Sequence, residues 1–146
     1  MTDPIIKQYG DHWERNKIFL VESGTVKWTE MGWPENDPPL KGVKGLYVLY
    51  RGDKPIYVGI GLTGVDPIAD RIQTHARDWL APWWDSVCWY DFGENVETAQ
   101  LIESFLISHG IGLWNGADSG GNLFGKQVFL EGDNSASIDL WKGKKS

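Results

Sequence analysis

Residues 45–60 hold two β-rich runs of apolar and aromatic residues, separated by a polar, turn-forming stretch. The first run is Gly45-Leu46-Tyr47-Val48-Leu49-Tyr50 and the second is Ile56-Tyr57-Val58-Gly59-Ile60. Residues 51–55 lie between them and consist of turn-forming and charged residues, Arg-Gly-Asp-Lys-Pro. β-branched and aromatic residues favour strands, and the Gly-Asp and Pro positions favour a reversal of the chain. The pattern predicts a β-hairpin.

The alternation of side chains along a strand also assigns the two faces of this hairpin. Successive side chains of a strand point to opposite faces. We expect the core face to carry Leu46, Val48, Tyr50, Ile56, Val58 and Ile60. Tyr47 and Tyr57 then share the other face, where Gly59 leaves open space beside Tyr57.

A helix is predicted over residues 66–80. Asp66 suits the N-cap and Pro67 suits the first helical position. Arg71 and His75 are four residues apart, so they are neighbours on the helix surface. Its buried stripe is expected to contain Ile68, Ile72 and Trp79.

A second helix is predicted from about Asn95 to Gly110, with the glycine just past its end. Within it, Glu103 has mainly apolar neighbours on the helical wheel, namely Ala99, Ile102, Leu106 and Ile107. Burying an unpaired carboxylate is costly. The position therefore indicates a cation partner, which is either a metal ion or an internal arginine.

Shorter patterns complete the prediction. Ser86–Tyr90 is a predicted strand, Ile18–Val21 and Thr25–Trp28 a pair of short strands, and Gln127–Leu130 a further strand. We expect one α/β (α+β) domain over residues 1–146, with a small, mainly antiparallel central sheet flanked by helices. Residues 1–44 are an N-terminal extension, 45–115 the core, and 116–146 a C-terminal loop, strand and tail.

Charge and composition restrict the possible functions. The formal net charge of the 146-residue chain is −6, and residues 45–115 hold four basic and nine acidic side chains. This balance argues against tight nonspecific binding of nucleic acid, which depends on clustered lysine and arginine. One cysteine, Cys88, excludes an intramolecular disulfide or a zinc cluster of several thiolates. With neither a signal peptide nor a membrane span expected, a cytoplasmic location is predicted.

The order of these elements resembles the GIY-YIG nuclease family. Gly45-Leu46-Tyr47 and Tyr57-Val58-Gly59 stand where the family has its two name-giving triplets. They are followed by Arg71 with His75, then Glu103, then Asn115, in the family's order. The resemblance covers residues 45–115, about half of the chain. The stretch Ile60-Gly61-Leu62 departs from the pattern, because many members have a lysine or another polar residue there.

The resemblance implies a divalent-metal-dependent endonuclease that hydrolyses phosphodiester bonds, in DNA rather than RNA. Glu103 would bind Mg²⁺ or Mn²⁺, and Arg71 would contact the scissile phosphate. Asn115 would orient the site. Tyr47, Tyr57 and His75 remain alternative general bases, because a tyrosine needs help to ionise at neutral pH and imidazole titrates near it.

Two other interpretations of the function remain open. The first is a binding module on the same scaffold, with weak or no catalysis, that holds nucleic acid or a protein. The second uses the nine tryptophans for stacking, either on bases or on sugars. A carbohydrate-binding protein would place several of them on one open surface, the candidates being Trp28, Trp33, Trp83 and Trp84.

Overall fold

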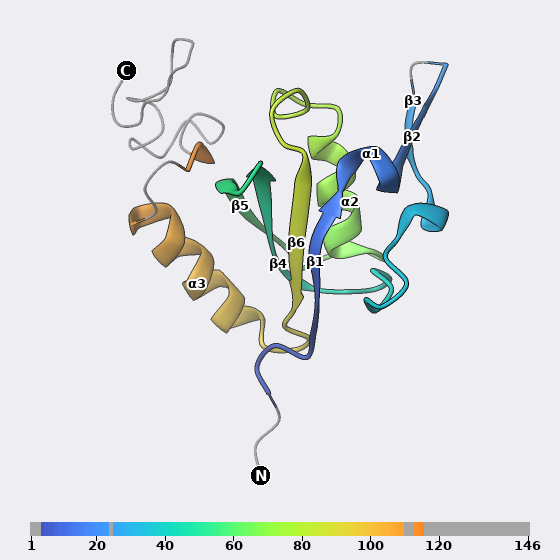
Figure 1. Cartoon of the computed structure of the whole chain (residues 1–146). Helices are drawn as coiled ribbons and strands as arrows, with labels where there is room; N and C mark the ends of the chain where they lie inside the picture. Colours follow the sequence, from blue (N-terminus) through green and yellow to red (C-terminus); the bar gives the residue numbers. More distant parts are fainter. Residues whose placement is uncertain (1–3, 24, 110–112, 116–146) are drawn as a thin grey trace. The chain divides into compact units, whose positions relative to one another are not determined.

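The computed structural model describes residues 4–23, 25–109 and 113–115 (Figure 1). The chain divides into two compact units. The first comprises Met1–Lys54 and Gly59–Gln100, and the second comprises Pro55–Val58 and Leu101–Ser146. The expected strand at 127–130 and the C-terminal loop and tail lie outside the described residues.

The fold is α+β, with a mainly antiparallel central sheet of four strands flanked by helices, as predicted. The strands are β1 (Gln8–Glu14), β4 (Gly45–Arg51), β5 (Lys54–Gly61) and β6 (Ser86–Asp91), in the order β1-β6-β4-β5. β6 runs antiparallel to both of its neighbours. The predicted hairpin is confirmed as β4 and β5, and the predicted strand at 86–90 is confirmed as β6.

Strand β1 is a finding that the sequence did not reveal. It comes from the N-terminal segment that we placed outside the core, and it pairs with β6 along the edge of the sheet. The pairing register shifts between Gly10 and Trp13. This irregularity interrupts the two-residue periodicity by which a strand is recognised in a sequence.

The rest of the N-terminal segment forms short elements. These are α1 (Arg15–Ile18), β2 (Phe19–Glu22), β3 (Thr25–Trp28) and η1 (Glu30–Gly32). β2 and β3 form a separate antiparallel pair, which confirms the two short strands predicted there. Aromatic rings link this pair to its surroundings, in the contacts Trp13–Trp33, Trp28–Trp33, Phe19–Trp28 and Phe19–Trp84.

Helix α2 (Pro67–His75) begins at Pro67 as predicted but ends earlier than expected. The chain leaves the helix in a tight turn, in which the Arg77 amide donates to the carbonyl of Thr74 at 3.0 Å. Asp66 is the N-cap residue as predicted, although its side chain makes no capping bond. Its Oδ1 instead accepts from the backbone N–H of Gly42 at 2.7 Å, so the carboxylate fastens the preceding loop.

Both faces of β4 are covered. Leu46 and Leu49 lie on opposite faces and are 4% and 0% exposed, while Tyr47, which shares the face of Leu49, is 0% exposed. The expectation that Tyr47 lies on the face away from the core was therefore wrong. Helix α2 contacts β4, and buries Ile68 and Ile72 completely.

Helix α3 (Val96–His109) has the predicted bounds to within a residue. Its first residues, through Gln100, belong to the first unit and the remainder to the second. Ala99 is fully buried, whereas the large apolar side chains of Leu101 and Phe105 are exposed. In the part of the chain that the structure describes, no helix combines the length and the apolar character that crossing a bilayer requires.

Candidate active site

A buried hydrogen bond joins Tyr47 to His75. The Tyr47 hydroxyl lies 2.7 Å from His75 Nε2, although the two residues are 28 positions apart in the chain. Strand β4 supplies the tyrosine and the last residue of α2 supplies the histidine. Tyr47 is 0% and His75 2% exposed, so both rings sit in the interior. Two of the six site residues predicted from the sequence are thus brought into direct contact.

Asp78 extends this contact into a network of three side chains. His75 Nδ1 lies 2.8 Å from Asp78 Oδ2, and the backbone N–H of Leu80 donates to the other carboxylate oxygen at 2.9 Å. An ionised carboxylate can only accept, which assigns the Nδ1 proton to the imidazole. In the neutral ring Nε2 is then the acceptor, and the Tyr47 hydroxyl donates to it. The arrangement can move a proton from the phenol to an imidazole that a carboxylate stabilises.

Sequence reasoning did not single out Asp78. It was expected to lie within a longer helix, where a charged residue three positions after a histidine is ordinary. The early end of α2 turns the chain so that Asp78 faces back toward His75. The sequence signal that could have found it is the spacing of three between a buried histidine and a carboxylate.

Gly59 makes room for the network. A Cβ added at this position would overlap the ring and hydroxyl of Tyr47. The expectation that Gly59 leaves open space was therefore wrong, because Tyr47 fills it. The glycine is needed at this point for the close approach of two strands and a tyrosine.

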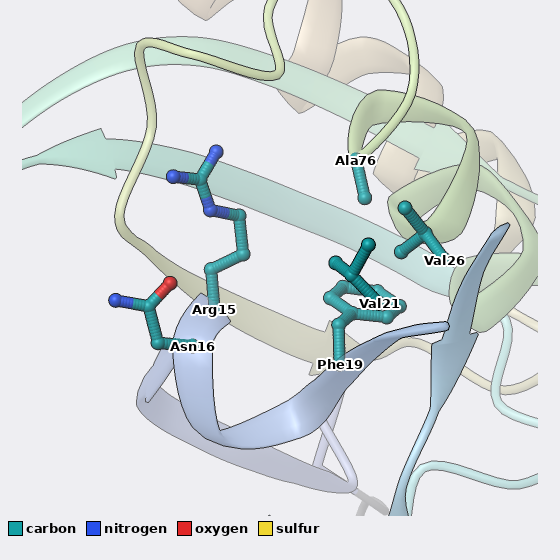
Figure 2. Close-up of a pocket in the computed structure, with 6 residues that line it drawn as sticks. All are labelled: Arg15, Asn16, Phe19, Val21, Val26 and Ala76. Carbon is teal, nitrogen blue, oxygen red and sulfur yellow. The ribbon is translucent and has the colours of Figure 1, made fainter. Parts of the chain in front are cut away.

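A pocket of about 420 Å³ opens beside the end of α2 (Figure 2). Arg15 and Asn16 lie on one side of it and four apolar residues, Phe19, Val21, Val26 and Ala76, on the other. Ala76 directly follows His75 in the chain. Arg15 stacks on Trp84 at 5.3 Å from the ring centroid, and the Trp84 Nε1–H donates to the His75 carbonyl at 3.0 Å. Burial lowers the pKa of the Arg15 guanidinium, and the nearby carboxylate of Asp85 opposes that effect.

Arg71 lies on α2 one turn before His75, and its side chain is exposed. A guanidinium in this position can be reached by a ligand from solvent. Arg77, just beyond the helix, is also exposed. Both arginines are exposed, but Arg71 lies within α2 and Arg77 lies after its end.

Three predicted residues belong to the second unit. Asn115 is buried, and its side-chain amide bonds both polar groups of the Val58 backbone: Oδ1 accepts from the N–H and Nδ2 donates to the carbonyl. Tyr57, next to Val58, is 6% exposed. The neighbouring Trp114 amide donates to the Ile56 carbonyl at 2.6 Å. Asn115 thus holds the strand segment that carries Tyr57.

Glu103 lies on α3 in the second unit and is partly exposed. The neighbours Leu106 and Ile107 are also only partly buried, so the carboxylate borders an apolar surface rather than a closed core. One accessible carboxylate, completed by water and phosphate oxygens, is a donor set that Mg²⁺ accepts. The residue therefore fits the predicted metal.

Among the described residues, the four candidate tryptophans do not form the open surface that sugar binding requires. Trp84 is 0% exposed, and Trp28 and Trp33 pack against each other at a centroid distance of 5.8 Å. Trp83 is 40% exposed, and the Arg51 guanidinium lies 5.2 Å from its ring centroid. Of the four candidate residues, Trp83 alone offers a substantially exposed ring.

Comparisons of this chain with models of protein families, with curated proteins and with solved structures find no match.

Proposed function

We propose that this protein is a divalent-metal-dependent endonuclease of the cytoplasm that hydrolyses phosphodiester bonds in nucleic acid, DNA rather than RNA. The observation that carries the proposal is the hydrogen-bonded series Tyr47–His75–Asp78, with distances of 2.7 and 2.8 Å. Tyr47 and His75 were singled out from the sequence as candidate bases. Their contact supports a shared task in proton transfer.

The hydrogen bonds from Tyr47 to His75 and from His75 to Asp78 would help the tyrosine to act as a base. A phenol with an ordinary pKa of about 10 does not ionise at neutral pH without help. His75 accepts the Tyr47 proton at Nε2, and Asp78 stabilises the resulting imidazolium. The phenolate oxygen then takes a proton from the attacking water, while the water oxygen bonds to phosphorus and the leaving oxygen departs. Positioned bases of this kind contribute about 10²–10⁴-fold to rate.

The phosphate needs positive charge, because negative charge builds on its oxygens during the reaction. Arg71 supplies a planar, bidentate donor from the exposed surface of α2. Glu103 would hold Mg²⁺ or Mn²⁺, which neutralises charge on the phosphate when bound. Asn115 contributes indirectly, by fixing the backbone next to Tyr57.

A binding module without catalysis is the second candidate, and one observation favours it. Tyr47 has no exposed surface, so water reaches its hydroxyl only if the surrounding side chains move. A fully satisfied buried network can also serve to fix a single packing arrangement. In that case the protein would bind nucleic acid or a protein partner through its surface and leave the strand uncut.

Supercoiled plasmid DNA distinguishes the two candidates. The wild-type protein should nick it in the presence of Mg²⁺ and not after chelation. Arg71→Ala should lower the nicking rate about 10²-fold or more, since an electrostatic donor to the transition state is worth that much. Arg77→Ala is the matched control, being an exposed arginine just beyond the same helix. Equal activity of the two variants would refute the role of Arg71, and DNA binding without nicking would support the binding module.

A further inference from the structure

The irregularity in β1 gathers three different metal-binding side chains at the sheet edge. They are Asp11, His12 and Cys88, and one potential ligand atom of each lies within 4.8 Å of the others. Asp11 and His12 come from β1, and Cys88 from the adjacent β6. None of them takes part in the proposed nuclease site.

The backbone of His12 explains how two consecutive residues reach one face. In a regular strand Asp11 and His12 would point to opposite sides of the sheet. Here His12 has φ of +50°, in the left-handed region, at the register shift between Gly10 and Trp13. Residues other than glycine rarely adopt this conformation. β-bulges commonly serve to re-aim side chains in this way.

Two of the three ligand-atom distances are close to those around a tetrahedral zinc ion, and all three are within 4.8 Å. Zinc bonds to oxygen, nitrogen and sulfur at about 2.0–2.3 Å, which places neighbouring ligand atoms roughly 3.3–3.6 Å apart. Asp11 Oδ1 lies 3.6 Å from Cys88 Sγ and 3.8 Å from His12 Nε2. The first distance already matches, and the second exceeds the expected range only slightly.

The second nitrogen of His12 has the partner that a metal-bound imidazole normally has. His12 Nδ1 lies 3.2 Å from Ser86 Oγ. A proton on Nδ1, donated to the serine, leaves the lone pair on Nε2, the nitrogen that faces Asp11. Ligating histidines usually donate their other ring N–H to a second group that fixes ring and tautomer. The Tyr50 ring packs against His12 at a centroid distance of 4.5 Å and further restricts the orientation of the imidazole.

We propose that Asp11, His12 and Cys88 form a zinc-binding site, with Ser86 positioning the histidine. Thiolate, imidazole and carboxylate together favour Zn²⁺ over Mg²⁺, which prefers oxygen ligands alone. Asp11 and His12 are exposed, with side-chain exposures of 68% and 46%, so the ion can enter from solvent. Three protein ligands leave the fourth position for water or another ligand. On binding, the Cys88 thiol releases its proton to solvent and the sulfur bonds to zinc.

Titration of chelator-treated protein with ZnCl₂ tests the site without reference to nuclease activity. We expect one equivalent to bind, and Co²⁺ in its place to show a thiolate-to-cobalt charge-transfer absorption. Asp11→Asn and Cys88→Ala should each weaken zinc binding by more than 10-fold, and Ser86→Ala by about 10-fold or more. His109→Gln, an exposed histidine on α3, and Asp53→Asn, an exposed aspartate in the β4–β5 turn, are the controls and should bind as the wild type does.

Unchanged affinity in Asp11→Asn would overturn the proposal, and so would the absence of the charge-transfer band. Asp11 is exposed, so this variant keeps its fold even if the buried Cys88 does not tolerate replacement. Mg²⁺ in large excess should not displace the zinc. Loss of Mg²⁺-dependent nicking alone would leave the zinc result intact, since the two sites share no residue.

Discussion

The hydroxyl end of Tyr47 occupies the space beside Gly59 in which any other residue would place its Cβ. The lack of a side chain at Gly59 on β5 thereby allows Tyr47 of β4 to reach His75. The overlap would involve the Tyr47 ring carbons as well as the oxygen. Accommodating it would require the tyrosine to move away from His75.

Gly59→Ala should therefore destabilise the fold and break the Tyr47–His75 contact together. Overpacking of a filled core costs about 1–3 kcal/mol, and the displaced hydrogen bond adds to this loss. Urea unfolding followed by tryptophan fluorescence measures the change. Gly52→Ala is the control, because a Cβ there meets nothing within 4 Å and only the left-handed backbone, with φ of +63°, opposes it. A Gly59→Ala protein as stable as the Gly52→Ala protein would contradict this account of the packing.

Tyr47→Phe separates the chemical part of the network from its packing part. The ring remains, while the donor to His75 is lost, so we expect a stability loss of about 1 kcal/mol. If the phenol transfers protons, plasmid nicking should fall about 10²–10⁴-fold. Tyr9→Phe removes a hydroxyl from an exposed tyrosine of β1 and should change neither quantity. Full nicking by Tyr47→Phe would leave the tyrosine a structural role only.

Glu103→Gln tests the metal assignment. The amide keeps the size of the side chain but removes the charge that would bind Mg²⁺, so nicking should fall at least about 10²-fold at any Mg²⁺ concentration. Because the amide matches the size of the carboxylate and Glu103 is partly exposed, the loss of nicking should be much larger than any loss in the free energy of unfolding. Glu97→Gln alters an exposed glutamate in the first turn of the same helix and should retain activity. Equal nicking by both variants would remove Glu103 from the site.

The hairpin and the helices could be predicted from the sequence because their signals are local. Two β-rich runs around a turn indicated β4 and β5, and Pro67 marked the first residue of α2. The end of α2 could not be predicted in the same way. It depends on a turn closed by the Arg77 amide and on Asp78, which bonds to His75 after the chain has folded back.

The faces of the hairpin were harder to predict than its strands. A two-residue period says which side chains share a face, but not what covers that face. Tyr47 was expected on an open side and is buried, because α2 packs there. Strand β1 was missed for a related reason, since the irregularity that brings Asp11 and His12 together also conceals the strand pattern. Local rules thus identified Tyr47 as a candidate but not its burial, and they missed the conformation that brings Asp11 and His12 together.

Alkaline pH should destabilise the protein through groups around the zinc-binding site. Burial raises the pKa of the Cys88 thiol above its ordinary value of 9.0, and of the Tyr50 and Tyr90 hydroxyls above 10.0. Each group then ionises more readily in the unfolded chain than in the folded protein. The stability that follows from this difference is complete below the unfolded pKa and is lost as pH rises toward the folded value.

For metal-free protein we therefore expect a free energy of unfolding that is steady below about pH 9 and falls above it. Urea unfolding at a series of pH values measures this dependence. Cys88 is the group with the lowest unfolded pKa of the three, and Cys88→Ala removes its ionisation. The free energy of unfolding of this variant should therefore begin to fall about one pH unit higher, where the tyrosines start to ionise. A decline at the same pH in both proteins would exclude the thiol as its cause. Because zinc would hold Cys88 as a thiolate in the folded state, the stabilisation by added zinc should grow as pH rises toward the raised pKa of that thiol, since below this pKa zinc must displace the thiol proton.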